Sequence, residues 1–174
     1  FLKEGIVQAG VSRFGSGNPL IVDRECVVGY RDKATKQRIR TEISNDLRRA
    51  IKGNKPKWFK PKLSASECDA LAIDENGDLL AVEVKPDTAS AGDVVNAPVQ
   101  AWLYSRQFQQ WADEANPDVA PRDVIRGMYN QRRQLGLSVG PRNAKVNSRL
   151  TVHPVVAIRP GYSKEVRRRF KEVV

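Results

Sequence analysis

Apolar residues recur along the chain at two different spacings, which predict its helices and its strands. Helical spacing is clearest over about residues 35–52, and Gly53 follows as a stop signal. The apolar face of this predicted helix consists of Ile39, Ile43, Leu47, Ala50 and Ile51. The first half of the chain therefore contains one amphipathic helix.

Three further helices are predicted in the second half of the chain. The first begins at about residue 96 or 97 and runs to 115, with Pro98 tolerated in its first turn and Asn116-Pro117 beyond its end. The second covers about residues 122–135. The last begins at Ser163, a favourable N-cap residue. Its apolar face consists of Val166, Phe170 and Val173.

Short apolar runs between turn residues predict the strands. Residues 20–22 form one such run after a glycine-rich loop over 10–19, and residues 150–158 form another, which Pro154 confines to a sheet edge. Residues 67–85 form a hairpin, because two apolar runs, Cys68 to Ile73 and Leu79 to Lys85, flank an Asn-Gly pair. The order of these elements describes an α/β sandwich.

The second hairpin strand, Leu79-Leu80-Ala81-Val82-Glu83-Val84-Lys85, does not alternate between apolar and polar residues until its end. Strands of this kind are usually buried on both faces. We therefore expect helices to cover both faces of this strand.

The charges are segregated along the chain. Among 174 residues, 30 are Lys or Arg and 20 are Asp or Glu, which gives a formal charge of +10. Residues 31–62 hold 12 basic and 3 acidic residues, residues 63–121 hold 2 and 11, and residues 122–149 hold 7 and 1. A basic excess favours a polyanionic partner, either a nucleic acid or an anionic membrane surface.

Length and composition indicate a single globular domain over residues 1–174. No apolar run approaches the roughly 18 residues of a membrane span, and Phe1-Leu2-Lys3-Glu4-Gly5 does not resemble a signal peptide. The chain begins without methionine, as a processed or trimmed protein does. We expect a protein of the cytoplasm that does not enter a membrane.

Cysteine and histidine are too scarce for zinc chemistry or for a nuclease with a histidine base. Cys26 and Cys68 both stand beside apolar residues, so we expect two reduced, buried thiols. His153 is the single histidine, and we expect it to be structural, at the edge of a strand.

Three charged residues in the hairpin suggest a reaction centre. Glu83 and Lys85 are two apart, so they point to one face of their strand. A charged pair on a buried strand is costly unless another group compensates for it. A divalent metal ion held by Asp69 and Glu83 would do so.

The length of the hairpin loop decides whether these two acids meet. A two-residue loop, Asn76-Gly77, places Asp69 opposite Val84 and on the wrong face. A three-residue loop beginning at Glu75 places Asp69 opposite Glu83. We predict the three-residue loop with Gly77 as a bulge, because a type I turn followed by a left-handed glycine is a common hairpin connection.

The next helix adds Gln100 and Tyr104, which are four apart and share a face. The set Asp69, Glu83-Val84-Lys85 and Gln100-Ala101-Trp102-Leu103-Tyr104 resembles the PD-(D/E)XK nuclease superfamily, in particular its RecB-like branch with a Gln-x-x-x-Tyr motif. The resemblance covers about residues 40–158. It implies a restriction-endonuclease-like α/β sandwich, whose central mixed sheet carries a catalytic hairpin flanked by helices.

The resemblance also implies a role for each matching residue in the hydrolysis of DNA phosphodiester bonds. Asp69, Glu83 and the backbone carbonyl of Val84 would hold Mg²⁺ or Mn²⁺, which prefer oxygen ligands. Lys85 would assist the attacking water and neutralise the phosphate. Gln100 and Tyr104 would position these groups by hydrogen bonds. The motifs distinguish neither an endonuclease from an exonuclease nor DNA from RNA.

The family often takes a further acid from the preceding helix, and Glu42 is the candidate here. An ion pair of Glu42 with Arg38 on a solvent-exposed face explains this residue nearly as well. Basic and aromatic residues elsewhere are candidates for contacts to nucleic acid. These candidates are Lys57, Trp58, Lys60, Arg167 and Arg168.

Less specific interpretations stay open. Glu83 and Lys85 form a structural ion pair in one of them, and Gln100 and Tyr104 are ordinary helix residues in another. In a third, Trp58 and Phe59 pack on the core while their neighbouring lysines are solvated. A basic nucleic-acid-binding module that retains the fold without cleavage is the alternative function.

Overall fold

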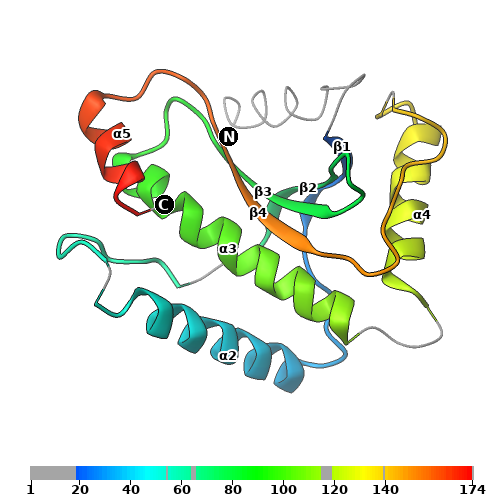
Figure 1. Ribbon diagram of the computed structural model, residues 1–174, viewed down its shortest axis with the longest axis horizontal. Coiled ribbons are helices and arrows are strands. Elements are labelled where there is room, and N and C mark those ends of the chain that lie inside the picture. Colours follow the sequence, from blue (N-terminus) through cyan, green and yellow to red (C-terminus); the bar gives the residue numbers. More distant parts are fainter. Residues whose placement is uncertain (1–18, 54, 64–65, 115–118, 139, 174) are drawn as a thin grey trace.

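The computed structural model describes residues 19–53, 55–63, 66–114, 119–138 and 140–173. Within these residues it contains four strands and four helices (Figure 1). The strands are β1 (Leu20–Cys26), β2 (Cys68–Ile73), β3 (Leu79–Lys85) and β4 (Val152–Ile158). The helices are α2 (Lys33–Ile51), α3 (Ala91–Asp113), α4 (Pro121–Gln134) and α5 (Lys164–Lys171).

The strands form one mixed sheet in the order β1-β2-β3-β4. β2 is antiparallel to both β1 and β3, and β4 is parallel to β3. Figure 1 shows α3 crossing one face of the sheet, with α2 on the far side of α3 and α4 near β1. The α/β class expected from the order of elements is confirmed.

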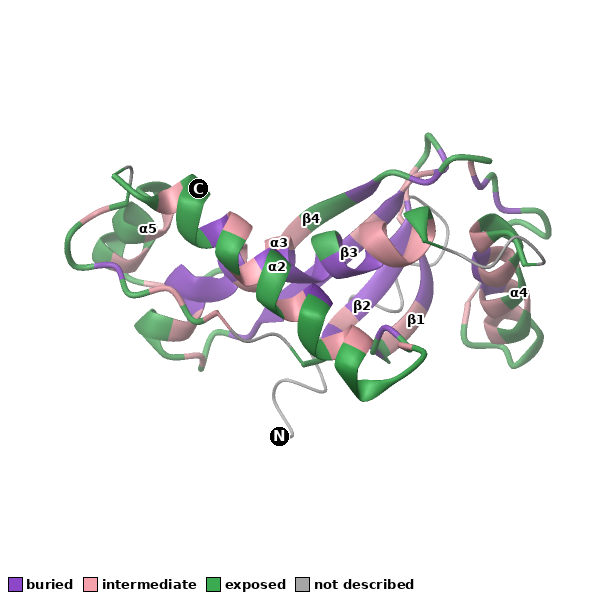
Figure 2. Ribbon diagram, turned by 90° about the horizontal axis from the view of Figure 1, so that it is seen from below, coloured by how far each residue is buried: buried purple, intermediate pink, exposed green. Residues whose placement is uncertain are grey.

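The main core lies between α3 and the sheet. Odd-numbered residues of β2 and β3, including Leu71 and Leu79, face Val99 and Leu103 of α3, and Ile43 of α2 joins them. Figure 2 shows the buried residues along β2 and β3. Odd-numbered residues of the hairpin therefore point toward α3.

The opposite face of the sheet holds a second buried cluster, which consists of Ile21, Ala70, Ala72, Val82 and Val84. Leu80, Val155 and Ala157 pack against it, so every member among the described residues belongs to a strand. The expectation of helices on both faces of β3 is thus confirmed on the α3 face alone, for the part of the chain that the structure describes.

Two predicted helices begin at side-chain caps. Asp32 begins α2 by accepting a hydrogen bond from the Thr35 N–H at 2.7 Å. Ser163 begins α5 by accepting one from the Val166 N–H at 3.3 Å, as predicted. Gly53 follows α2 with a φ of 87°, a backbone conformation that favours glycine.

The predicted start of α3 was wrong. The helix begins at Ala91, because the hydroxyl of Ser90 accepts a hydrogen bond from the Asp93 N–H and caps it there. Pro98 therefore lies inside the helix and not in its first turn. Helix packing against the sheet outweighs the hydrogen bond that a proline removes. The predicted end at Asn116-Pro117 lies outside the described residues.

The outer strands follow the sequence pattern with two differences. β4 is an edge strand that contains Pro154, as predicted, but it begins at Val152. β1 continues to Cys26, beyond the predicted end at Val22, and a register shift between Ile21 and Asp23 interrupts its pairing. Most of the predicted loop over 10–19 lies outside the described residues.

Both cysteines are free and buried, as expected. His153 lies half-exposed on β4, with its Nε2 3.6 Å from a carboxylate oxygen of Asp78. Among the helices of the described residues, none is both long enough and apolar enough to span a bilayer.

Candidate functional site

The β2–β3 hairpin has the predicted three-residue loop. Ile73 pairs with Leu79 and Ala70 pairs with Val82, so the register does not change between these two pairs. The Asp74 N–H donates to the Asp78 carbonyl at 3.0 Å, which closes the loop around Glu75, Asn76 and Gly77. Continued by one step beyond Ala70, this register places Asp69 opposite Glu83.

The side chain of Asp74 holds this loop in place. Its Oδ1 accepts hydrogen bonds from the N–H groups of Asn76 at 2.9 Å and Asp78 at 2.8 Å. Gly77 has a φ of 92°, in the left-handed region that the predicted bulge requires. A second segment anchors the turn, because the Asn147 N–H donates to the Gly77 carbonyl at 2.9 Å.

Asp69 and Glu83 come together on the face of the sheet that packs against α3. The Asp69 carboxylate extends across to β3, where its Oδ2 accepts a hydrogen bond from the Val84 N–H at 2.7 Å. The N–H and carbonyl of one strand residue point to the same side of the strand. The Val84 carbonyl therefore points toward β2, the side on which the Asp69 carboxylate lies.

Lys85 completes a buried charged group with Glu83. Its Nζ is 2.5 Å from Oε1 of Glu83. Both residues are buried, with 9% of Lys85 and 3% of Glu83 exposed. The prediction that Glu83 and Lys85 point to the same face of their strand is confirmed.

Two carboxylates lie close together in this group, and Lys85 pairs with that of Glu83. Burial, and then the neighbouring Asp69 carboxylate, raises the pKa of Glu83 from 4.5 to about 7, although Lys85 acts in the opposite direction. At neutral pH, Glu83 therefore holds a proton in a substantial fraction of molecules. A further cation next to Asp69 and Glu83 would favour the ionised carboxylate.

Tyr104 of α3 lies above these acids. It is 6% exposed, and burial followed by the charges of Glu83 and Asp69 raises its pKa. The phenol is therefore protonated at neutral pH and able to donate a hydrogen bond. Gln100 is half-buried one helical turn earlier, on the same face of α3.

The oxygen atoms of this site suit a small, hard divalent cation. Mg²⁺ is commonly held by one or two carboxylates and keeps several water ligands. Asp69, Glu83 and the Val84 carbonyl offer this kind of donor set. Within the described ranges, no group of three or more His, Cys, Asp or Glu side chains lies together, so the acids that the structure supplies here are two.

The structure does not bring Glu42 to this site. Its carboxylate forms an ion pair with Arg38 at 3.0 Å, and half of each side chain is exposed. The solvent-exposed interpretation of Glu42 describes its position, because its carboxylate pairs with Arg38 and half of its side chain is exposed. The metal-binding role expected of Glu42 therefore has no geometric support.

Sequence reasoning missed a second ion pair close to the site. Lys62 Nζ is 2.5 Å from Oδ1 of Asp93, and the Lys62 N–H donates to Oδ1 of Asn96 at 2.8 Å. Hydrogen bonds from Lys62 and Ser90, and then the charges of Lys62 and Lys85, lower the pKa of Asp93. No sequence pattern signals this pair, because 31 residues separate its members.

The basic and aromatic candidates lie beside α5. Trp58 is 39% exposed, its Nε1 donates to Glu172 at 3.2 Å, and the guanidinium of Arg169 lies 5.3 Å from the centre of its ring. The neighbouring Phe59 is buried, whereas the two lysines of this set are exposed. These lysines are Lys57 and Lys60.

The two arginine candidates on α5 are both occupied by contacts within the protein. Arg168 forms ion pairs with Glu165 and Glu172. Arg167 donates from Nε to the Tyr162 carbonyl at 2.9 Å. The structure therefore brings Trp58 and α5 together, but Arg168 is already neutralised by two carboxylates.

Comparisons of the chain with protein-family models, with curated proteins and with solved structures found no match.

Proposed function

We propose that this protein is a metal-dependent nuclease that hydrolyses DNA phosphodiester bonds at the Asp69–Glu83–Lys85 site. One observation supports this proposal above the others: a three-residue loop brings Asp69 and Glu83 to one face of the hairpin, with Lys85 2.5 Å from Glu83. A buried carboxylate beside a second, partly buried one is unfavourable for folding alone. Such pairs are typical of functional sites.

Asp69, Glu83 and the Val84 carbonyl hold Mg²⁺ or Mn²⁺ in this proposal. When bound, the cation makes a coordinated water more acidic and neutralises charge on the scissile phosphate. The Val84 N–H keeps the Asp69 carboxylate oriented through its 2.7 Å hydrogen bond. Second-shell hydrogen bonds of this kind fix the orientation of a ligand carboxylate.

Lys85 contributes a positive charge and three hydrogen-bond donors beside the reacting phosphate. It orients the attacking water and stabilises the negative charge that develops on the phosphate oxygens. Glu83 holds the lysine in place, because both side chains are buried and paired. Tyr104 donates from its protonated hydroxyl, and Gln100 adds an amide donor from the preceding turn.

The decisive experiment measures cleavage of a panel of linear, circular, single-stranded, flapped and four-way-junction DNA. We expect cleavage with Mg²⁺ or Mn²⁺ and none with EDTA. Lys85→Ala is expected to lower the rate by about 10²-fold or more. Lys164→Ala, which removes an exposed lysine at the start of α5, serves as the matched control and is expected to leave the rate unchanged.

Three outcomes overturn the proposal: no cleavage of any substrate, cleavage that persists in EDTA, or equal effects of the two lysine variants. DNA binding without cleavage in the presence of metal would identify the protein as the non-catalytic binding module. RNA included in the same panel shows whether the substrate is DNA alone.

A further inference from the structure

We infer that a basic groove between α2 and α3 binds the phosphate backbone of a single nucleic-acid strand and leads it to the hairpin site. This inference deepens the proposed function by naming the path of the substrate. It rests on that function for its biological meaning, although the test below needs no cleavage. We refer to the hollow as the α2–α3 groove.

The α2–α3 groove has a volume of about 320 Å³. Its described lining consists of Gln37, Arg40, Thr41, Ile43, Ser44, Arg48, Leu63, Ser66, Leu103 and Gln107. Two of these residues are arginines and five carry neutral hydrogen-bonding groups. None of the described lining residues is acidic, which makes the groove suited to an anion.

A second hollow of about 640 Å³ continues the groove toward the start of α2, because Gln37 and Arg40 line both. It adds Lys33 and Lys36 to the wall. Asp32 also lines it, but this carboxylate accepts the N–H of Thr35 as the helix cap. The positive charge of the lysines therefore continues that of the groove.

Four basic residues and one serine form a stripe along α2. Lys33, Lys36, Arg40, Ser44 and Arg48 follow each other at intervals of three or four residues. This spacing places them on one face of the helix. At about 1.5 Å per residue, the stripe is about 22 Å long.

The other flank of the same helix, where Arg38 also lies 3.9 Å from Glu114 at the end of α3, differs in its charge balance. Arg38 pairs there with Glu42 at 3.0 Å, and Arg49 pairs with Asp46. Acidic partners thus lie beside the arginines of this flank, whereas no acidic residue is among the described lining residues of the α2–α3 groove. A charged face that only keeps the protein soluble does not require this division.

On both walls of the groove, a lining residue lies close in sequence to the hairpin site. On the α3 wall, Leu103 lines the groove and the next residue, Tyr104, lies above Asp69 and Glu83. On the other wall, Ser66 stands three residues before Asp69. A strand lying in the groove is therefore directed toward the segments that carry these carboxylates.

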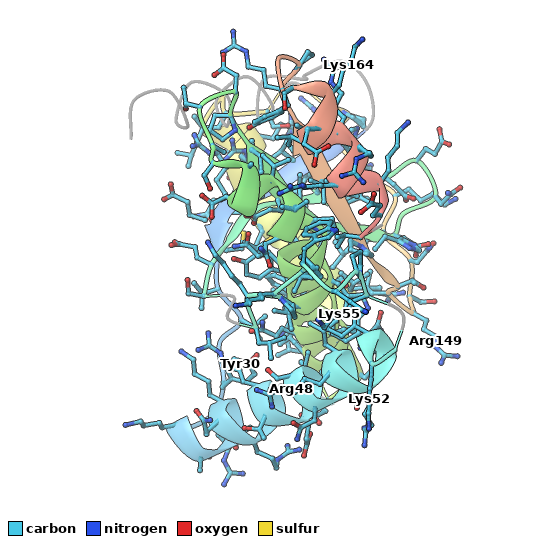
Figure 3. All side chains as sticks on the ribbon, turned by 90° about the vertical axis from the view of Figure 1, so that its left-hand side faces the viewer. Tyr30, Arg48, Lys52, Lys55, Arg149 and Lys164 are labelled. Atoms are coloured by element: carbon cyan, nitrogen blue, oxygen red, sulfur yellow. The ribbon has the colours of Figure 1, made fainter. Side chains whose placement is uncertain are left out.

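Tyr30 lies beside this path. Its hydroxyl donates to Oε1 of Gln107 at 3.1 Å, and its ring is half-buried in the wall of the second hollow. Figure 3 shows Tyr30 and Arg48 along the side of α2 that faces α3. A positively charged groove with an aromatic side chain is the usual surface for a single strand. The small volume of the groove, about 320 Å³, favours one strand over a duplex.

The test measures binding of a fluorescent single-stranded oligonucleotide in EDTA, by fluorescence anisotropy at several salt concentrations. Arg40→Gln with Arg48→Gln is expected to weaken binding on the order of tenfold and to make it less dependent on salt. The control, Arg38→Gln with Arg49→Gln, removes the same charge from the flank of α2 where both arginines pair with acids. It is expected to change binding by less than about twofold.

Arg48→Gln alone is a second variant. Because Arg48 is exposed, this substitution should leave the fold intact, so weaker binding would report the loss of its charge. Equal losses in the two arginine pairs, or unchanged binding by the groove variants, would overturn the inference. Tighter binding of a duplex, or competition by phosphatidylserine vesicles, would overturn it as well. If binding in the groove is confirmed but no DNA is cleaved with Mg²⁺, the proposed nuclease function is wrong and the inference about the groove still holds.

Discussion

The backbone N–H of Val84 donates a hydrogen bond to the side chain of Asp69, with 2.7 Å between the nitrogen and Oδ2. This contact joins the start of β2 to the end of β3 through a side chain. It keeps one oxygen of Asp69 on β3 while the same carboxylate remains close enough to raise the pKa of Glu83. The orientation of Asp69 is therefore built into the hairpin.

This arrangement predicts opposite effects of Asp69→Asn on stability and on metal binding. The amide oxygen is able to accept the Val84 hydrogen bond, and the change removes a negative charge beside buried Glu83. In EDTA we expect a higher melting temperature than that of the unmodified protein. With Mg²⁺, the unmodified protein should gain stability and the variant should not. Calorimetry with and without Mg²⁺ measures both effects.

The control for this prediction is Asp113→Asn, which removes a carboxylate at the end of α3. It should leave the Mg²⁺-dependent stabilisation unchanged. A lower melting temperature of Asp69→Asn in EDTA would show that the two carboxylates do not oppose folding. An unchanged response to Mg²⁺ would show that Asp69 is not a ligand.

The turn glycine supports a second prediction. A Cβ on Gly77 would lie 3.2 Å from the backbone nitrogen of Asn147 and also from a side-chain atom of Lys145, and its φ is 92°. Gly53 has a φ of 87° but open space around its Cα. Both Gly→Ala variants adopt a left-handed backbone, at about 1–2 kcal/mol, but only Gly77→Ala adds crowding.

We therefore expect Gly77→Ala to lose more stability than Gly53→Ala, by about 1 kcal/mol or more. Urea unfolding of both variants measures this difference. Equal losses of unfolding free energy in the two variants would mean that Asn147 moves away from the added methyl group at no cost in stability. In that case, the segment around Asn147 does not hold the hairpin turn in place.

The sequence predicted the hairpin well because its information is local. The choice of loop followed from Asn76-Gly77, from the favourable position of Asp74 and from the two-residue period of strands. The structure confirms this loop. The position of Asp69 opposite Glu83 then needed no further information.

Tertiary contacts account for what the sequence could not predict. Pro98 indicated a later start for α3, but the Ser90 cap and packing on the sheet extend the helix in front of it. The role of Glu42 could not be decided from its spacing along α2. Only the tertiary structure shows that its carboxylate pairs with Arg38 and that half of its side chain is exposed. The Lys62–Asp93 pair joins segments whose proximity no periodic pattern reports.

The buried cysteines support a third prediction. Cys26 and Cys68 are opposed in the pairing of β1 with β2. Burial raises the pKa of Cys26 to about 12 and that of Cys68 as well. Because the thiolate is the reactive form, iodoacetamide should label neither residue in the folded protein at mildly alkaline pH. Both should react in urea, as mass spectrometry would show. Rapid labelling of the folded protein would contradict the burial of these thiols.

The raised pKa of Glu83 predicts how stability depends on pH without metal. An unfolded glutamate ionises near 4.5, whereas folded Glu83 ionises near 7. Between these values the folded state binds more protons than the unfolded state, so stability falls as pH rises. Glu83 therefore stabilises the fold most below about pH 4.5, and this contribution is lost as the pH rises through about 7.

Glu83→Gln removes this titration, so its unfolding free energy should fall less between pH 5 and 7 than that of the unmodified protein. Glu75→Gln, which removes an exposed carboxylate from the hairpin turn, is the control and should keep the original slope. Urea unfolding in EDTA across this range measures the slopes. Parallel curves for Glu83→Gln and the unmodified protein would show that Glu83 is ionised throughout. Saturating Mg²⁺ should flatten the unmodified curve as well, because a cation at Asp69 and Glu83 lowers the pKa of Glu83 toward its ordinary value.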